Sequence, residues 1–155
     1  MKNLFSVDGI VVVITGGSRG IGEMIAAGYL ANGAKVYITS RKAAVCDATA
    51  QRLAETWGGE CISIPADMTT LEGIEGFVSE LSSKESHVDI LVNNAGVAWG
   101  APLEEFPEVG WDKVMDTNVK GVFFLTQKLL PLLEQNAAHD APSHVINVGS
   151  IDGIK

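Results

Sequence analysis

Short apolar runs alternate with stretches of helical periodicity from one end of the chain to the other. Ile10-Val-Val-Val-Ile14 is a continuous run of β-branched residues, a pattern typical of a strand buried on both faces. Similar runs recur four times further along. We therefore predict five strands, at residues 10–14, 35–39, 61–64, 88–92 and 144–148.

Between these runs, apolar residues recur at spacings of three and four, which places them on one face of a helix. The clearest faces consist of Ile21, Ile25 and Tyr29 in the first stretch, and of Val122, Leu125, Leu129 and Leu133 in the last. Gly33, directly after Asn32, is a natural stop for the first helix. Strand–helix–strand repetition implies right-handed crossovers. The predicted fold class is therefore α/β, a doubly wound parallel sheet with helices on both faces, in a single domain over residues 1–155.

Composition and net charge limit the kinds of binding partner that we expect for this chain. The chain has 155 residues, of which 46% are hydrophobic and 19% charged, and its formal net charge is -8. An acidic surface repels phosphate backbones and anionic lipid, so we expect no nucleic acid and no membrane partner. The first residues lack the apolar segment of a signal peptide. Cys46 and Cys61 form no CxxC or Cys/His cluster, which predicts free thiols, no metal site and a cytoplasmic protein.

A glycine-rich turn directly follows the first predicted strand and opens into a helix. A dinucleotide pyrophosphate requires glycine here, because the turn is tight and the backbone must approach the phosphates closely. The helix N-terminus adds free N–H groups and a partial positive charge. Ordinary turns also contain glycine, but the position between strand and helix favours a Rossmann-type cofactor site. The predicted contacts come from Gly16, Ser18, Arg19, Gly20, Ile21 and Gly22.

Charge at the end of the second strand indicates which cofactor would bind. An acidic residue there would bond the adenosine ribose and exclude a 2′-phosphate. This chain has Ser40 and Arg41 instead, with Arg19 in the glycine turn on the same side. Two guanidinium groups can hold a phosphate dianion through charge-assisted hydrogen bonds. We therefore predict NADP(H); the alternative is that Arg41 and Lys42 only begin a solvated helix.

The spacing of the glycines, with three residues between Gly16 and Gly20, resembles that of the short-chain dehydrogenase/reductase family. Further motifs follow in the family's order, and the resemblance extends from about residue 7 to residue 155. They are Asp67 with Met68, the run Asn93-Asn94-Ala95-Gly96, Asn118 and Ser150. Within the family, the chain is most similar to 3-oxoacyl-thioester (acyl-carrier-protein) reductases, in particular those of the rhamnolipid-biosynthesis type.

This resemblance implies a role for each motif. Asp67 and Met68 would contact the adenine, and the segment from Asn94 to Gly96 would line the cofactor. Ser150 would hydrogen-bond the substrate carbonyl, and Asn118 would help to hold a water molecule. The implied activity is NADPH-dependent reduction of a ketone, such as a 3-oxoacyl thioester, to a secondary alcohol by hydride transfer.

The family's proton donor is a Tyr-x-x-x-Lys pair roughly a dozen residues beyond the serine. The chain ends at Lys155, before that position, and its two tyrosines are Tyr29 and Tyr37, in the first helix and second strand. We therefore expect the N-terminal part of a longer reductase, without the family's C-terminal strands and helices, and inactive alone. The alternative is a catalytically silent module that binds NADP(H).

The substrate and the partner subunits are less defined by the sequence. Residues 134–140 contain no Lys or Arg, so an acidic carrier protein would dock poorly there. Either a basic patch lies elsewhere, or the substrate is a CoA ester or a free ketone. The resemblance also implies a homodimer or homotetramer, with the helix that starts near Asn118 at its interface. Trp99, just past the cofactor-lining run, either packs internally or borders the substrate pocket.

Overall fold

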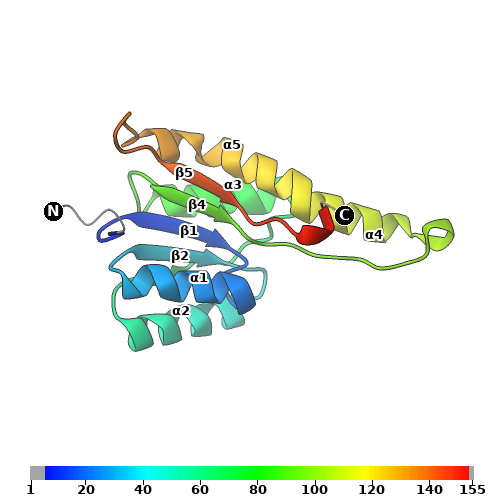
Figure 1. Cartoon of the computed structure of the whole chain (residues 1–155), viewed down its shortest axis with the longest axis horizontal. Coiled ribbons are helices and arrows are strands. Elements are labelled where there is room, and N and C mark those ends of the chain that lie inside the picture. Colours follow the sequence, from blue (N-terminus) through cyan, green and yellow to red (C-terminus); the bar gives the residue numbers. More distant parts are fainter. Residues whose placement is uncertain (1–5, 154–155) are drawn as a thin grey trace.

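The centre of the protein is one parallel sheet, which the computed structural model describes together with the rest of residues 6–153. The strand order is β3-β2-β1-β4-β5 (Figure 1). The strands are β1 (Val11–Thr15), β2 (Lys35–Thr39), β3 (Cys61–Ser63), β4 (Ile90–Asn93) and β5 (His144–Asn147). The five predicted strands are confirmed, with ends displaced by at most about two residues.

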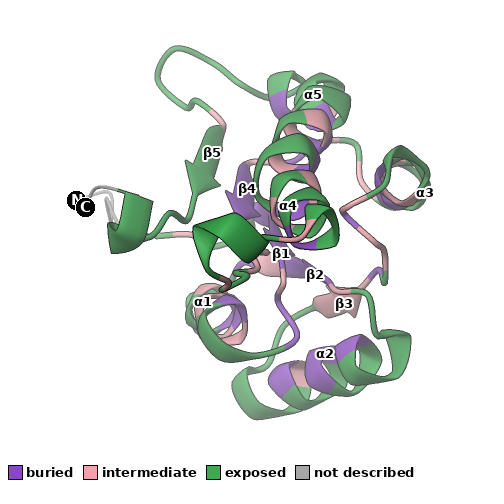
Figure 2. Cartoon of the chain, turned by 90° about the vertical axis from the view of Figure 1, so that its right-hand side faces the viewer, coloured by how far each residue is buried: buried purple, intermediate pink, exposed green. Residues whose placement is uncertain are grey.

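Helices lie on both faces of this sheet, as predicted. They are α1 (Gly20–Ala31), α2 (Ala43–Trp57), α3 (Leu71–Ser82), α4 (Glu108–Met115) and α5 (Gly121–Glu134). A π-helical turn, Asp116–Lys120, joins α4 to α5, and short 3-10 turns span Leu103–Glu105 and Ile151–Gly153. Helices α1 and α2 cover one face, and α3 and α5 cover the other (Figures 1 and 2). No helix in residues 6–153 has both the length and the apolar character needed to cross a bilayer.

Side chains of the inner strands fill two hydrophobic cores, one on each face. Val12 and Ile14 of β1 pack with α1 and α2, whereas Val13 packs with α3 and α5. Successive side chains of a strand point to opposite faces, so a strand that is apolar at every position serves both cores. The Rossmann-type doubly wound sheet is thereby confirmed.

The apolar face predicted for the first helix is confirmed in part: Ile25 and Tyr29 are half-buried and pack against the core, but Ile21 does not. Ile21 is 58% exposed, and the buried residues of α1 are Gly22, Ala26 and Leu30. Gly22 must face the turn after β1, because a side chain there would overlap the carbonyl oxygen of Gly16. With Gly22 against the turn, Ala26 and Leu30 follow on the same face of α1 and are buried against the sheet.

The face predicted for the last helix is confirmed. Leu125, Leu129 and Leu133 of α5 are buried in the core shared with α3, and Val122 is half-buried.

Strand β5 departs from the prediction that residues 144–148 are buried on both faces. All four of its residues are exposed, with Val145 at 41% and Ile146 at 42% (Figure 2). The strand pairs with β4 on one side, and in the described part of the chain no strand lies on its other side. The apolar pattern therefore predicted the strand correctly, and its exposure reflects the free side of β5 within residues 6–153.

Candidate functional site

The candidate site lies at the carboxyl ends of the strands, where β1 and β4 are neighbours. From β1 the chain proceeds through α1 to β2 on one side, and from β4 it proceeds to β5 on the other. Open parallel sheets bind ligands at such a switch point, in the crevice between connections that run in opposite directions. The predicted cofactor residues all follow the ends of β1, β2, β3 or β4.

The glycine turn after β1 has the backbone geometry that only glycine adopts readily. Gly16 has φ +65° and Gly20 has φ +56°, both in the left-handed region. At Gly22 a side chain would overlap the Gly16 carbonyl oxygen and lie 2.5 Å from Nδ2 of Asn94. A β-carbon at Gly20 would meet nothing within 4 Å, so the turn faces open space there.

The N-terminus of α1 opens at this turn. Its N-cap residue, Arg19, is extended and exposed, and its side chain caps no backbone N–H group. The first N–H groups of a helix have no partner within the helix, and together they carry a partial positive charge. The combination of this helix end, the glycine turn and the Arg19 guanidinium is suited to bind a phosphate group.

Hydrogen bonds join this turn to the end of β4. Oγ1 of Thr15 accepts from the backbone N–H groups of Asn94, at 3.0 Å, and Ala95, at 2.9 Å. In return, Nδ2 of Asn94 donates to the carbonyl oxygen of Thr15 at 2.9 Å. The segment from Asn94 to Gly96 is thus held beside the glycine turn.

The end of β2 carries two hydroxyl groups that sequence reasoning did not include among the site residues. Among the described residues, Oγ1 of Thr39 and Oγ of Ser40 are buried and have no hydrogen-bond partner. Leaving such a group unsatisfied costs about 1–3 kcal/mol. Arg41 follows directly and is exposed. An anionic group bound at this strand end would accept a hydrogen bond from a hydroxyl group and pair with the guanidinium of Arg41. The residues present therefore fit a phosphorylated cofactor. In the sequence, this part of the site is marked by Thr39 and Ser40, two hydroxyl residues at the end of an apolar strand.

The loop after β3 is rigid where the adenine contacts were predicted. Oδ1 of Asp67 accepts from the backbone N–H and the hydroxyl of Thr69, at 3.0 and 2.8 Å. Met68 is buried, and its carbonyl oxygen lies against Gly121 so closely that any side chain there would overlap it. Asp67 and Met68 are therefore fixed at the same edge of the sheet as Asn94 and Ser40.

Asn118 lies on the π-helical turn and holds the loop that leaves β4. Its Oδ1 accepts from the N–H group of Val97 at 2.9 Å, and its Nδ2 donates to the carbonyl oxygen of Val97 at 2.8 Å. This pairing uses the side-chain acceptor and one donor hydrogen. A π turn in an α-helix frequently marks a functional site. Sequence reasoning did not predict this turn.

Ser150 lies in the exposed segment that follows β5. Its Oγ accepts from the backbone N–H of Asp152 at 3.2 Å. Asn93 and Asn147 are register partners in β4 and β5, and Nδ2 of Asn93 donates to Oδ1 of Asn147 at 2.9 Å. This pair joins the buried Asn93 to the exposed Asn147, and Ser150, three residues later, lies at the edge where the cofactor residues gather.

Comparison with known proteins shows which family and which proteins this chain is similar to. The family described as short chain dehydrogenase matches residues 10–155. The rhamnolipids biosynthesis 3-oxoacyl-[acyl-carrier-protein] reductase of Pseudomonas aeruginosa is 48% identical over 154 residues, which are 99% of this chain and 59% of that protein. The gluconate 5-dehydrogenase of Gluconobacter oxydans is 39% identical over 125 residues, covering 81% of this chain and 48% of that protein.

Solved structures give the same result. The Pseudomonas aeruginosa RhlG/NADP active-site complex superposes with a TM-score of 0.94 at 48% identity, covering all of this chain and 60% of that one. L-Sorbose reductase from Gluconobacter frateurii, complexed with NADPH and L-sorbose, gives 0.86 at 29% identity, covering 94% of this chain and 54% of that one. The chain spans about 60% or less of the length of these relatives. The resemblance seen in the sequence is confirmed: the chain belongs to the short-chain dehydrogenase/reductase family.

Proposed function

We propose that this chain carries the cofactor-binding part of an NADPH-dependent reductase, which reduces a 3-oxoacyl thioester or a similar ketone to a secondary alcohol. The observation that carries the proposal is the open end of α1, where the glycine turn, free N–H groups and Arg19 meet. Relatives solved with NADP or NADPH support the same cofactor. When bound, the nicotinamide supplies the hydride that reduces the carbonyl carbon.

The protein's own residues bind and orient the cofactor. The pyrophosphate binds to backbone N–H groups of the turn formed by Gly16, Ser18, Gly20, Ile21 and Gly22. Arg19 and Arg41 hold the 2′-phosphate, and the unpartnered hydroxyl of Ser40 accompanies them. Asp67 and Met68 contact the adenine from the rigid loop after β3.

Ser150 and Asn118 are the catalytic residues that this chain contributes. The Ser150 hydroxyl donates a hydrogen bond to the substrate carbonyl, which stabilises charge on that oxygen. Asn118 helps to hold a water molecule, and its side chain holds the loop after β4 through Val97.

A second candidate is an NADP(H)-binding module without catalysis, and it requires that neither tyrosine of residues 1–155 acts as the proton donor. Tyr37 is buried in β2 and donates to Oε1 of Glu85 at 2.6 Å. Burial, followed by this hydrogen bond, raises the pKa of Tyr37 well above its usual value of 10.0. Tyr29 lies in α1, and burial raises its pKa also. Neither tyrosine is a proton donor for a substrate at Ser150.

The substrate class follows from one relative, which is named as a 3-oxoacyl-[acyl-carrier-protein] reductase. The end of α5 and the turn after it, residues 134–140, contain Glu134 and Asp140 and no Lys or Arg, so this segment does not attract an acidic carrier. Either a basic patch elsewhere meets the carrier, or the substrate is a CoA ester or a free ketone.

The family's homodimer is the assembly that we propose. Met115, Val119, Phe123 and Leu130 expose apolar side chains along α4, the π turn and α5, with Phe123 at 61%. A second copy of this surface would bury them. Cys46 and Cys61 are free, which suits a reducing compartment, and we propose the cytoplasm.

The experiment that tests the function is a titration of the protein, in its full natural length, with NADPH and with NADH. It is followed by an assay of NADPH consumption with acetoacetyl-CoA. Preferential binding of NADPH together with turnover supports the reductase. Binding without turnover of any ketone supports the silent module, and failure to bind either cofactor contradicts both.

A further inference from the structure

We infer that Trp99, Gly110 and Lys113 form an indole clamp, which positions the loop after β4 and thereby the nicotinamide end of the cofactor site. The inference rests on the proposed function, because it concerns the binding of NADPH. Trp99 belongs to the loop between β4 and α4, whereas Gly110 and Lys113 belong to α4. None of the three residues is among those predicted to bind the cofactor.

Gly110 shows that the contact is a close one. It is the buried residue of α4, and a β-carbon there would lie 2.8 Å from each of Cγ, Cδ1 and Nε1 of Trp99. The indole therefore lies directly on the helix backbone. Gly28 of α1 and Gly76 of α3 differ, because a β-carbon at either would meet nothing within 4 Å. A glycine weakens a helix, and at position 110 the indole supplies the reason for it.

Lys113 holds the same ring from a second direction. Its Nζ lies 5.3 Å from the centre of the Trp99 ring, within the range of a cation–π interaction. Trp99 is 38% exposed, so the ring is neither buried in the core nor free in solvent. The two helix residues, one turn apart, fix the indole in one orientation.

The clamp is one of three attachments along a short segment. Asn94 is bonded to Thr15, Val97 is bonded to Asn118, and Trp99 rests on α4. In a doubly wound sheet, the half built on β1 to β3 binds the adenosine, which leaves the nicotinamide to the side of β4 and β5. The segment from Asn94 to Trp99 therefore borders the nicotinamide half, and its outer end depends on the clamp.

The test separates the two halves of the cofactor. Affinities for NADPH and for adenosine 2′,5′-bisphosphate, which lacks the nicotinamide half, are measured by calorimetry on the protein in its full natural length. Gly110→Ala displaces the indole and is expected to weaken NADPH about tenfold, while adenosine 2′,5′-bisphosphate changes by less than about twofold. Lys113→Met is expected to weaken NADPH less, and Lys113→Arg to restore it, since Arg also binds aromatic faces. Gly76→Ala, which adds the same methyl group to another helix, is the matched control and changes neither affinity.

Fluorescence reports directly on the clamp. Replacing the exposed Trp57 and Trp111 by Phe leaves Trp99 as the single tryptophan of residues 1–155, and Gly110→Ala should shift its emission to longer wavelength. A shifted emission with unchanged NADPH affinity would overturn the inference, as would an equal loss of affinity for both ligands. If the unsubstituted protein binds neither ligand, the proposed function itself fails, which is a distinguishable result.

Discussion

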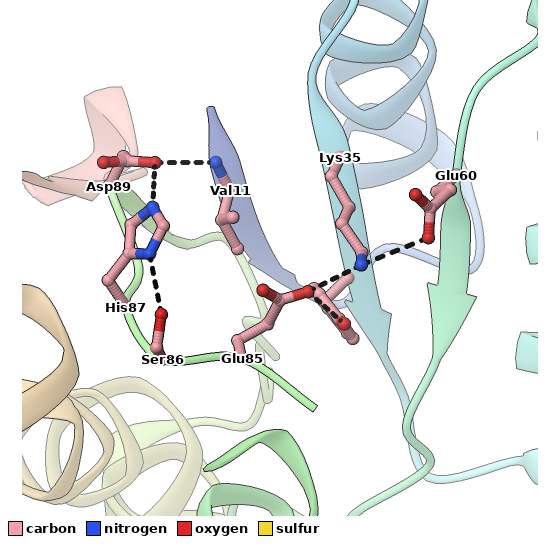
Figure 3. A network of polar contacts seen from close by, with 8 residues as sticks. Val11, Lys35, Glu60, Glu85, Ser86, His87 and Asp89 are labelled. Atoms are coloured by element: carbon pink, nitrogen blue, oxygen red, sulfur yellow. Dashed lines mark hydrogen bonds and ion pairs between the residues drawn. The ribbon is translucent and has the colours of Figure 1, made fainter. Parts of the chain in front are cut away.

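Nζ of Lys35 and Oε1 of Glu85 form an ion pair of 2.8 Å at the amino-terminal edge of the sheet, opposite the candidate cofactor site (Figure 3). The same Oε1 accepts from the Tyr37 hydroxyl, and Lys35 also contacts Glu60 at 3.1 Å. The Glu85 side chain is only 11% exposed. This network fixes the loop between α3 and β4 to strand β2, so its role is to stabilise the fold.

Replacing Glu85 by Gln is therefore expected to destabilise the protein. The substitution removes the charge that faces Lys35 and weakens the bond to the buried Tyr37 hydroxyl. We expect the free energy of unfolding, measured by urea denaturation, to fall by about 1–3 kcal/mol. Glu60→Gln is the matched control, because Glu60 is 67% exposed and an exposed pair contributes about 0–1 kcal/mol. Equal effects of the two substitutions would contradict this assignment.

The same carboxylate predicts an acid dependence of stability. Burial raises the pKa of Glu85, but the hydrogen bonds from Lys35 and Tyr37 lower it more, so the net shift is below the usual 4.5. A pKa that is lower in the folded state stabilises the protein above the unfolded pKa, and this contribution is lost as the pH falls through the folded pKa. We expect unfolding free energies measured from pH 6 downward to decline more in the natural protein than in Glu85→Gln below about pH 4.5. If the unfolding free energies of the two proteins decline in parallel, other carboxylates determine the acid dependence of stability.

Gly22→Ala tests the close contact between α1 and the glycine turn. Because the added methyl group overlaps the Gly16 carbonyl oxygen and approaches Asn94, the helix start must move. We expect a loss of about 1–3 kcal/mol in unfolding free energy, together with weaker NADPH binding. Gly28→Ala lies on the same helix, where the new methyl meets nothing within 4 Å, and should be neutral or stabilising by about 0.4–1 kcal/mol. Thermal melts and NADPH titrations of both variants distinguish a contact effect from a general helix effect.

Arg41→Ala is expected to weaken NADPH much more than NADH. A charge-assisted contact with the 2′-phosphate contributes about 1.5–3 kcal/mol, which is about ten- to a hundredfold in affinity. The neighbouring Lys42→Ala serves as the control for a change of local charge. Equal losses for NADPH and NADH in Arg41→Ala would refute the phosphate contact.

The sequence predicted the strands and the family well, because both depend on local patterns. Short runs rich in apolar and β-branched residues identified the five strands of residues 6–153, and the glycine turn lies between strand and helix. The centre of the buried face of α1 was displaced from the predicted one because Gly22, with no side chain to mark it, determines which side faces the sheet. The burial of β5 cannot be taken from its apolar pattern alone, because it depends on neighbouring elements.

Contacts between distant segments could not be predicted either. Two contacts arise only when the sheet and helices are assembled: the ion pair of Lys35 with Glu85, and the packing of Trp99 against Gly110. No periodicity marks such pairs. The unpartnered hydroxyl of Ser40 likewise follows from burial in three dimensions, although its position beside Arg41 was visible.

The bonds between Thr15 and Asn94 have a consequence for the order in which the protein acquires its function. They join residues 79 positions apart, so a growing chain that has already made the glycine turn still lacks half of the pocket. Loop closure over such a distance makes this contact a late event in folding. A cofactor that contacts both the glycine turn and the segment after β4 therefore binds only chains in which β4 has paired with β1. Its binding stabilises the whole sheet rather than one loop.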